Sequence, residues 1–175
     1  MSLLIAYGTI EGHSGKIARH VEALARDMGE DVTLFDTGDK RATINVAEFD
    51  KAILVASVHE RRHPQPFEIF LLAQRAQLEQ VRTMMLSVSL SAAFADGMEE
   101  AQDYLDEMKM RAQFEPDAEL LVAGAVNTRK YDFYATQVLK HVVLRGRNYD
   151  PAVQEHELTD WDALSAEVTA FLEGH

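Results

Sequence analysis

Uninterrupted apolar runs recur along the chain, separated by segments with a different spacing of polar and apolar residues. Runs of this kind are typical of strands that are buried on both faces of a sheet. One further segment alternates Val32 and Leu34 with polar neighbours, as an edge strand does. The pattern predicts buried strands over residues 3–7, 52–56, 83–90 and 118–126, and an edge strand over residues 31–35.

Between these strands, apolar residues recur every three or four positions, which is the period of an α-helix. Strands and helices in alternation predict an α/β fold, in which helices cover both faces of a parallel sheet. For the last helix we expect Thr159 as the N-cap, with Asp160 and Asp162 in the first turn, where the helix dipole favours acids. No linker or repeat interrupts the pattern, so we expect a single domain over residues 1–175, with helices over residues 14–28, 67–78, 97–113 and 161–172.

Composition and charge narrow the class of protein. The 175 residues include no cysteine, which excludes disulfides, thiolate metal sites and a cysteine nucleophile. Its 29 acidic and 17 basic side chains give a formal net charge of −12, which argues against a nucleic-acid partner. The first residues lack the basic start of a signal peptide, and no apolar run approaches the roughly 20 residues that span a bilayer. We therefore expect a cytoplasmic protein.

The loop after the first predicted strand has the composition of a phosphate-binding loop. Gly8, Gly12 and Gly15 allow close backbone approach and unusual dihedral angles, while Thr9 and Ser14 supply hydroxyl groups. Backbone N–H groups at the start of the following helix would add positive potential. Neither the P-loop pattern nor the Gly-x-Gly-x-x-Gly dinucleotide pattern fits this loop. The alternative is an ordinary flexible connection between strand and helix.

These residues resemble known sequences. Residues 9–14, Thr-Ile-Glu-Gly-His-Ser, resemble the phosphate-binding loop of flavodoxins, usually Thr-x-Thr-Gly-x-Thr. More narrowly, the chain is similar to the flavodoxin-like protoporphyrinogen oxidase family, the menaquinone-dependent protoporphyrinogen dehydrogenases of bacterial haem synthesis. That similarity covers nearly the whole chain in order, and it is carried by residues 56–63, 87–92, 122–126, 129–147 and 159–161.

The resemblance implies a flavodoxin-like three-layer sandwich, with five parallel strands in the order 2-1-3-4-5 and FMN at their carboxyl ends. The implied reaction is oxidation of protoporphyrinogen IX to protoporphyrin IX, with electrons leaving through FMN to a quinone. The residues expected to wrap the FMN phosphate are Thr9, Glu11, Gly12, His13 and Ser14. Those expected to flank the isoalloxazine are Ser57, Val58, His59, Glu60 and Arg61 on one side, and Ser87, Val88, Ser89, Leu90, Ser91 and Ala92 on the other.

A basic and aromatic insertion at about residues 127–150 stands between acidic flanks, which are typical of solvated helix faces. Its bases could pair with substrate propionates or with anionic lipid. The segment could lie peripherally at the inner face of the cell membrane. It could instead pack as a helix against the domain or a second copy of the chain, which the interruption of its apolar surface by Lys140 and His141 favours. The bases expected to contact substrate or membrane are Arg129, Lys130, Lys140 and Arg145.

The sequence offers no catalytic carboxylate pair, no metal cluster and no Ser-His-Asp arrangement, as expected where a flavin supplies the redox chemistry. His59 and His63 precede Pro64 and Pro66, which argue against a helix, so both are expected in a loop. His59 or Arg61 would contact the flavin or the propionates, or else lie on the surface. Two other functions stay open: an electron carrier with no organic substrate of its own, which docks a redox protein, and a flavin-free binding module.

Overall fold

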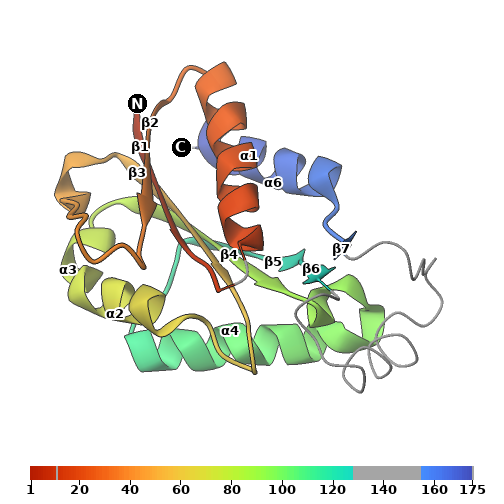
Figure 1. Ribbon diagram of the computed structural model, residues 1–175. Helices are drawn as coiled ribbons and strands as arrows, with labels where there is room; N and C mark the ends of the chain where they lie inside the picture. The colour runs from red at the N-terminus through yellow and green to blue at the C-terminus, as the bar shows by residue number, and fades with distance from the viewer. Residues whose placement is uncertain (11, 128–154, 175) are drawn as a thin grey trace.

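A parallel sheet of five strands forms the centre of the molecule, in the order β2-β1-β3-β4-β5 (Figure 1). This arrangement confirms the predicted α/β fold and the strand order expected from the resemblance, and β2 is an edge strand as expected. The computed structural model describes residues 1–10, 12–127 and 155–174. The strands of this sheet are β1 (Ser2–Gly8), β2 (Asp31–Asp36), β3 (Lys51–Ser57), β4 (Arg82–Ser89) and β5 (Ala118–Ala123).

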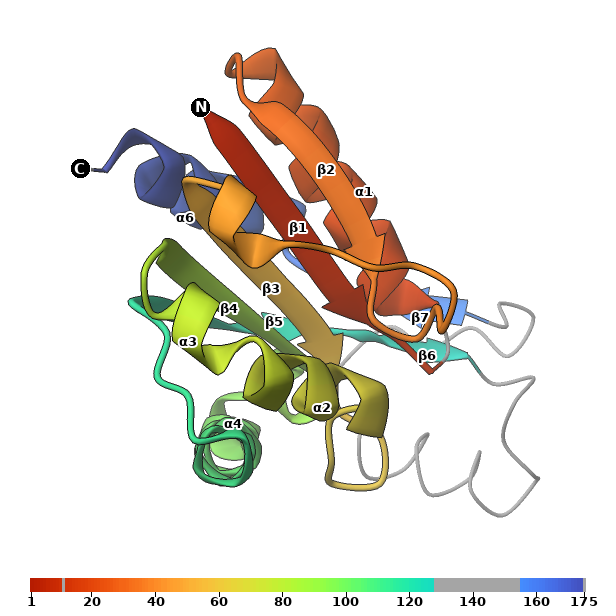
Figure 2. The ribbon, with the colours of Figure 1, turned by 90° about the vertical axis from the view of Figure 1, so that its left-hand side faces the viewer.

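Helices pack on both faces of the sheet, and each face has its own apolar core (Figures 1 and 2). Helices α1 and α6 cover one face, where Ile17 and Phe171 are buried. Helices α2, α3 and α4 cover the other face, where Phe67 and Leu105 are buried. The helices are α1 (His13–Asp27), α2 (Gln65–Ala73), α3 (Arg75–Leu78), α4 (Met98–Ala112) and α6 (Trp161–Glu173), with short 3-10 turns η1 (Val46–Glu48), η2 (Ser91–Ala93) and η3 (Ala95–Gly97).

The helix predicted over residues 67–78 is two helices. It begins earlier than expected, at Gln65, with Pro66 in its first turn, where the missing N–H removes no intrahelical hydrogen bond. The helix stops at Ala73, and Gln74 separates it from α3. His59 and His63 both lie in the loop before α2, as predicted.

The strand predicted over residues 118–126 is also divided, because the chain leaves the main sheet at Gly124. The Gly124 N–H donates to the Ser89 carbonyl at 3.1 Å, and a Cβ on Gly124 would lie 3.3 Å from Val88 Cγ1. The chain therefore passes close over the end of β4. Beyond this point it forms β6 (Ala125–Asn127), which pairs antiparallel with β7 (Glu155–Glu157).

The start of α6 corrects one prediction. The N-cap is Asp160, whose Oδ1 accepts a hydrogen bond from the Ala163 N–H at 3.0 Å. Thr159 is not the cap, because its hydroxyl donates instead to the Ala123 carbonyl at the end of β5, at 2.6 Å. Asp162 lies in the first turn, as expected.

The carboxyl ends of the central strands meet at one edge of the sheet. Gly8 pairs with Ala56, and Ser57 pairs with Val88, so β1, β3 and β4 end together. The loops that follow these strands therefore converge at that edge, which is where open parallel sheets bind ligands.

Some predicted features lie outside the described residues. They are Glu11 and most of the basic insertion expected at about residues 127–150, with Arg129, Lys130, Lys140 and Arg145. Within the described part of the chain, no helix is both long enough and apolar enough to cross a bilayer.

Candidate functional site

The loop between β1 and α1 makes a tight turn into a helix whose N-cap residue, Gly12, has no side chain to cap it. The Gly12 N–H donates to Thr9 Oγ1 at 2.7 Å, and Gly12 has a φ of 95°, in the left-handed region that side chains disfavour. Ser14 in the first turn of α1 is fully buried, yet its Oγ has no hydrogen-bond partner among the described residues. A buried hydroxyl without a partner is costly. Beside an uncapped helix start it fits an anion such as a phosphate group.

Packing requires a glycine at position 8, which the sequence analysis assigned to the phosphate-binding loop. A Cβ at Gly8 would lie 2.8 Å from Phe67 Cβ, so a side chain there would collide with α2. Only Gly12 of these two glycines is held in a left-handed conformation.

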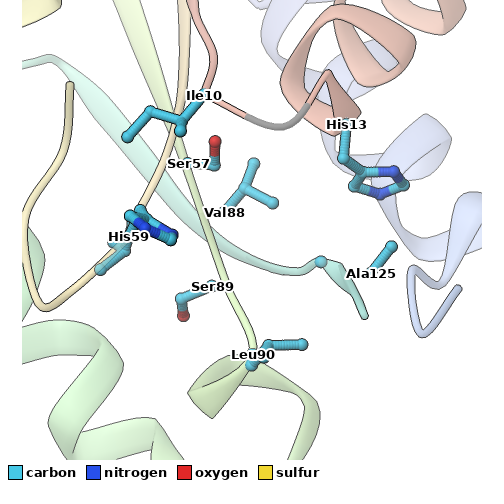
Figure 3. Close-up of a pocket in the computed structure, with 10 residues that line it drawn as sticks. Ile10, His13, Ser57, His59, Val88, Ser89, Leu90 and Ala125 are labelled. Carbon is cyan, nitrogen blue, oxygen red and sulfur yellow. The ribbon is translucent and has the colours of Figure 1, made fainter. Parts of the chain in front are cut away.

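A pocket lies where the loops converge (Figure 3). It holds about 440 Å³ of space, part of it open to solvent. His13 lies on one side of the pocket and His59 on the other, with Ser57, Val88 and Ser89 at the strand ends between them (Figure 3). The lining residues are Ile10, His13, Ser57, Val58, His59, Val88, Ser89, Leu90, Gly124 and Ala125.

The loop after β3 forms a two-residue hairpin at the pocket. The His59 N–H donates to the Arg62 carbonyl at 2.8 Å, and the Arg62 N–H donates to the His59 carbonyl at 3.1 Å. The two residues at the tip, Glu60 and Arg61, have φ of 50° and 70°. Such turns usually place Asn and Gly at these positions, because other side chains are strained there. Glu60 and Arg61 are both exposed.

Buried polar contacts hold the base of this hairpin. His63, only 3% exposed, is hydrogen-bonded through Nε2 to Ser87 Oγ of β4 at 2.8 Å. Burial lowers the pKa of His63 to about 4, so the imidazole is neutral at pH 7. Glu68 of α2 accepts hydrogen bonds from Arg62 at 3.0 Å and from Arg111 of α4 at 2.7 Å. Burial opposes the charge of Glu68, but the two arginines outweigh it and lower its pKa.

A second hollow adjoins the pocket. The two spaces share Val58, His59, Ser89 and Leu90 as lining residues. The second hollow is also lined by Glu60, Arg61, Ser91 and Tyr104. Burial and a hydrogen bond to Glu100 raise the pKa of Tyr104, while the positive charge of Arg61 opposes this rise. A flat aromatic ring and a cationic side chain thus lie on the walls of one hollow.

Ten of the sixteen residues predicted to bind a cofactor line the pocket or the adjoining hollow. His13, Ser57, Val58, His59, Val88, Ser89 and Leu90 line the pocket, and Glu60, Arg61 and Ser91 line the adjoining hollow. Thr9, Gly12 and Ser14 shape the first loop. Ser87 and Ala92 line neither the pocket nor the hollow. Ser87 is buried and hydrogen-bonded to His63, and the Ala92 N–H donates to Ser89 Oγ at 3.3 Å. The role of these residues in binding a cofactor stays a prediction.

Other residues at the site were not expected from the sequence. Ile10 lines the pocket beside residues of the predicted loop, and Tyr104 reaches the adjoining hollow from α4. Gly124 and Ala125 line the pocket because the chain lies close to the end of β4 at this point. A glycine within an otherwise apolar run can indicate such a close approach of two backbones. No local pattern predicts Tyr104, whose spacing is that of an ordinary core residue of a helix.

The chain belongs to the flavodoxin domain family, which matches residues 4–151. Over 168 residues it is 21% identical to protoporphyrinogen IX dehydrogenase (quinone) of Escherichia coli strain K12, covering 94% of this chain and 91% of the relative. The membership and this distant relationship confirm the resemblance described above.

Solved flavodoxins share the fold. The oxidised flavodoxin 1 of Bacillus cereus superposes with a TM-score of 0.59 at 14% identity, covering 100% of this chain and 99% of the other. The Fusobacterium nucleatum flavodoxin bound to flavin mononucleotide superposes with a TM-score of 0.52 at 12% identity, covering 98% and 94%. At these identities the similarity establishes the architecture alone.

Proposed function

We propose that this protein is an FMN-dependent oxidoreductase that oxidises protoporphyrinogen IX and passes the electrons to a quinone. The distant relationship to protoporphyrinogen IX dehydrogenase spans nearly the whole chain and supports the reaction class. The structural observation that carries the proposal is the uncapped start of α1 with the buried, unpartnered Ser14 hydroxyl beside a pocket. This arrangement fits a phosphate group joined to an organic ring system.

The residues present fit FMN. The amide groups of the first turn of α1 and the Ser14 hydroxyl would hold its phosphate, and the turn between Thr9 and Gly12 would shape the loop around it. The loop that begins at Ser57 and the loop around Ser89 would enclose the ring. FMN supplies the two-electron redox chemistry when bound, so the protein has to hold, orient and shield it.

The adjoining hollow supports a place for the organic substrate. Protoporphyrinogen IX carries two propionates and a broad apolar macrocycle. The Arg61 guanidinium at the hairpin tip would pair with a propionate, and the Tyr104 ring would contact the macrocycle. Conversion to protoporphyrin IX removes six hydrogen atoms in total, so three quinone molecules, each accepting two electrons and two protons, balance the reaction.

The direct test is anaerobic mixing of FMN-loaded protein with protoporphyrinogen IX. We expect bleaching of the flavin absorbance and growth of porphyrin fluorescence, followed by recovery of the absorbance when a quinone is added. The variant Arg61→Gln should raise the substrate concentration needed for half-maximal bleaching while leaving the FMN content unchanged. Loaded protein that does not bleach would contradict the proposed substrate.

The second candidate is an electron carrier without an organic substrate of its own. It is favoured by the acidic exposed face of α4, where Glu99, Asp103 and Glu107 could dock a basic redox partner. Under this alternative the loaded protein would exchange electrons with a reductase in a salt-dependent way and would ignore protoporphyrinogen IX.

A further inference from the structure

Tyr104 connects the wall of the adjoining hollow to a carboxylate at the surface. Its side chain is only 7% exposed, and it lines this hollow together with Ser91. The Tyr104 hydroxyl donates to Oε1 of Glu100, one turn earlier on α4, and Ser91 Oγ donates to Oε2 of the same carboxylate at 3.3 Å. Glu100 itself is exposed. Hydrogen bonds therefore lead from the hollow to a carboxylate that is in contact with water.

Counting hydrogens and lone pairs shows what the Tyr104 oxygen can still bind. A phenol has one hydrogen, and this one is directed to Glu100. The oxygen also has two lone pairs, of which the Ser91 hydroxyl uses at most one. Tyr104 Oη therefore keeps a lone pair that can accept a hydrogen bond from a donor in the hollow.

The surroundings of Tyr104 keep its hydroxyl protonated. Burial and the hydrogen bond to Glu100 raise the pKa of Tyr104, and this rise persists although the charge of Arg61 opposes it. The other titratable side chains that line the hollow are His59 and Glu60 of the hairpin. A phenol that stays protonated can take up a proton only if its own proton moves on, and Glu100 is the acceptor to which that proton already points.

The proposed reaction releases protons as well as electrons. In its first two-electron step, a carbon that bridges two pyrrole rings loses a hydride and a pyrrole N–H loses a proton. The hydride, with its electron pair, goes to the bound flavin. A proton acceptor within hydrogen-bond reach of the pyrrole nitrogen speeds such a step. A substrate that lies in the hollow against the Tyr104 ring would bring its pyrrole N–H groups towards the Tyr104 oxygen.

We propose that Tyr104 is a catalytic residue that accepts the pyrrole proton at Oη while its own proton passes to Glu100 and from there to solvent. The N–H bond of the substrate breaks and its electron pair stays on the nitrogen. A new O–H bond forms at Tyr104, and the former one is replaced by an O–H bond at the Glu100 carboxylate. Glu100 acts through Tyr104, as a positioning residue that also receives the proton. This inference rests on the proposed function.

The test is rapid mixing of FMN-loaded protein with protoporphyrinogen IX without oxygen, in H₂O and in D₂O. Tyr104→Phe keeps the ring and removes Oη, whereas Glu100→Gln keeps an oxygen that can accept from Tyr104 but no carboxylate to take the proton. Each should lower the limiting rate of flavin bleaching roughly hundredfold, with the half-saturating substrate concentration unchanged. The control Asp96→Asn removes an acid from the exposed turn η3 before α4 and should bleach like the unsubstituted protein. Bleaching of the unsubstituted protein should be slower in D₂O.

A second readout does not depend on the redox reaction. Binding of the product protoporphyrin IX to flavin-free protein, followed by its fluorescence, should have the same affinity in the unsubstituted protein and in both variants. Parallel loss of product affinity and bleaching rate would show a merely structural role and overturn the inference. Variants that bleach at the unsubstituted rate, or equal rates in H₂O and D₂O, would overturn it while leaving the proposed function intact. Loaded, unsubstituted protein that does not bleach would contradict the proposed function, and the inference with it.

Discussion

The strained hairpin tip gives a prediction in which stability and function change in opposite directions. Arg61 has a φ of 70°, and for a residue with a side chain this conformation costs about 1–2 kcal/mol relative to a right-handed one. Glycine avoids that cost but loses about 0.5–1 kcal/mol through the larger freedom of its unfolded chain. We therefore expect Arg61→Gly to raise the free energy of unfolding by about 0.5–1 kcal/mol, which corresponds to a rise of roughly 1–4 °C in Tm.

Gln113 provides a matched control for this substitution. It also has a positive φ, 52°, but it lies just after α4 and contributes to neither the pocket nor the adjoining hollow. Gln113→Gly should stabilise the protein by a similar amount, reduced slightly by the loss of its hydrogen bond with Arg75.

The assay is thermal and urea unfolding of the flavin-free protein, followed by substrate titration of the loaded protein. We expect both glycine variants to be stabilised, but only Arg61→Gly to require a higher concentration of protoporphyrinogen IX. Loss of stability in Arg61→Gly would refute the strain argument. It would mean that the contacts of the arginine side chain outweigh the backbone cost.

Three further predictions concern the phosphate loop and the buried charges. Gly12→Val should abolish FMN binding, measured by fluorescence quenching, because valine disfavours a φ of 95°, and the far-ultraviolet circular dichroism should not change; undiminished FMN affinity would count against this loop. Lys51→Met removes an ammonium that lies 3.3 Å from the largely buried Glu30 carboxylate and donates to the Leu172 carbonyl at 2.7 Å, so that Glu30 keeps the more distant N-terminal ammonium at 3.7 Å. The substitution should cost about 3 kcal/mol in urea unfolding, whereas a change below about 1 kcal/mol would argue that the pair is dispensable. His63 has a pKa of about 4 in the folded protein against the ordinary 6.5, so its contribution to the free energy of unfolding is complete above pH 6.5 and falls by about 3 kcal/mol towards pH 4. His63→Gln should therefore flatten the stability profile between these pH values. An unaltered slope would contradict the assignment.

The sequence predicts most of the architecture because each central strand is a continuous apolar run and each long helix has one apolar face. Its errors lie where a tertiary contact replaces a local preference. Thr159 has the chemistry of an N-cap, but its hydroxyl is used by the Ala123 carbonyl, and Asp160 takes the capping role. The apolar run over residues 118–126 predicts one strand, although the chain leaves the main sheet at Gly124. The close contact with the end of β4 that divides the strand does not change the spacing of apolar residues.

The sequence predicts the part of the candidate site that depends on strand topology, but not the part that depends on tertiary contacts. The positions of Ser57 and Ser89, the last residues of β3 and β4, follow from topology, since parallel strands end at a common edge. The contact between His13 and Thr159 joins residues 146 positions apart, and the position of Tyr104 depends on how α4 packs. Neither follows from composition, periodicity or spacing.

The most direct test of the account is the ³¹P spectrum of one equivalent of FMN added to flavin-free protein, recorded from pH 5.5 to pH 8. A phosphate held as a dianion by the start of α1 and the Ser14 hydroxyl should give a single resonance, shifted from that of free FMN, that does not titrate near the ordinary second pKa of about 6. A resonance that moves with pH as free FMN does would contradict the account.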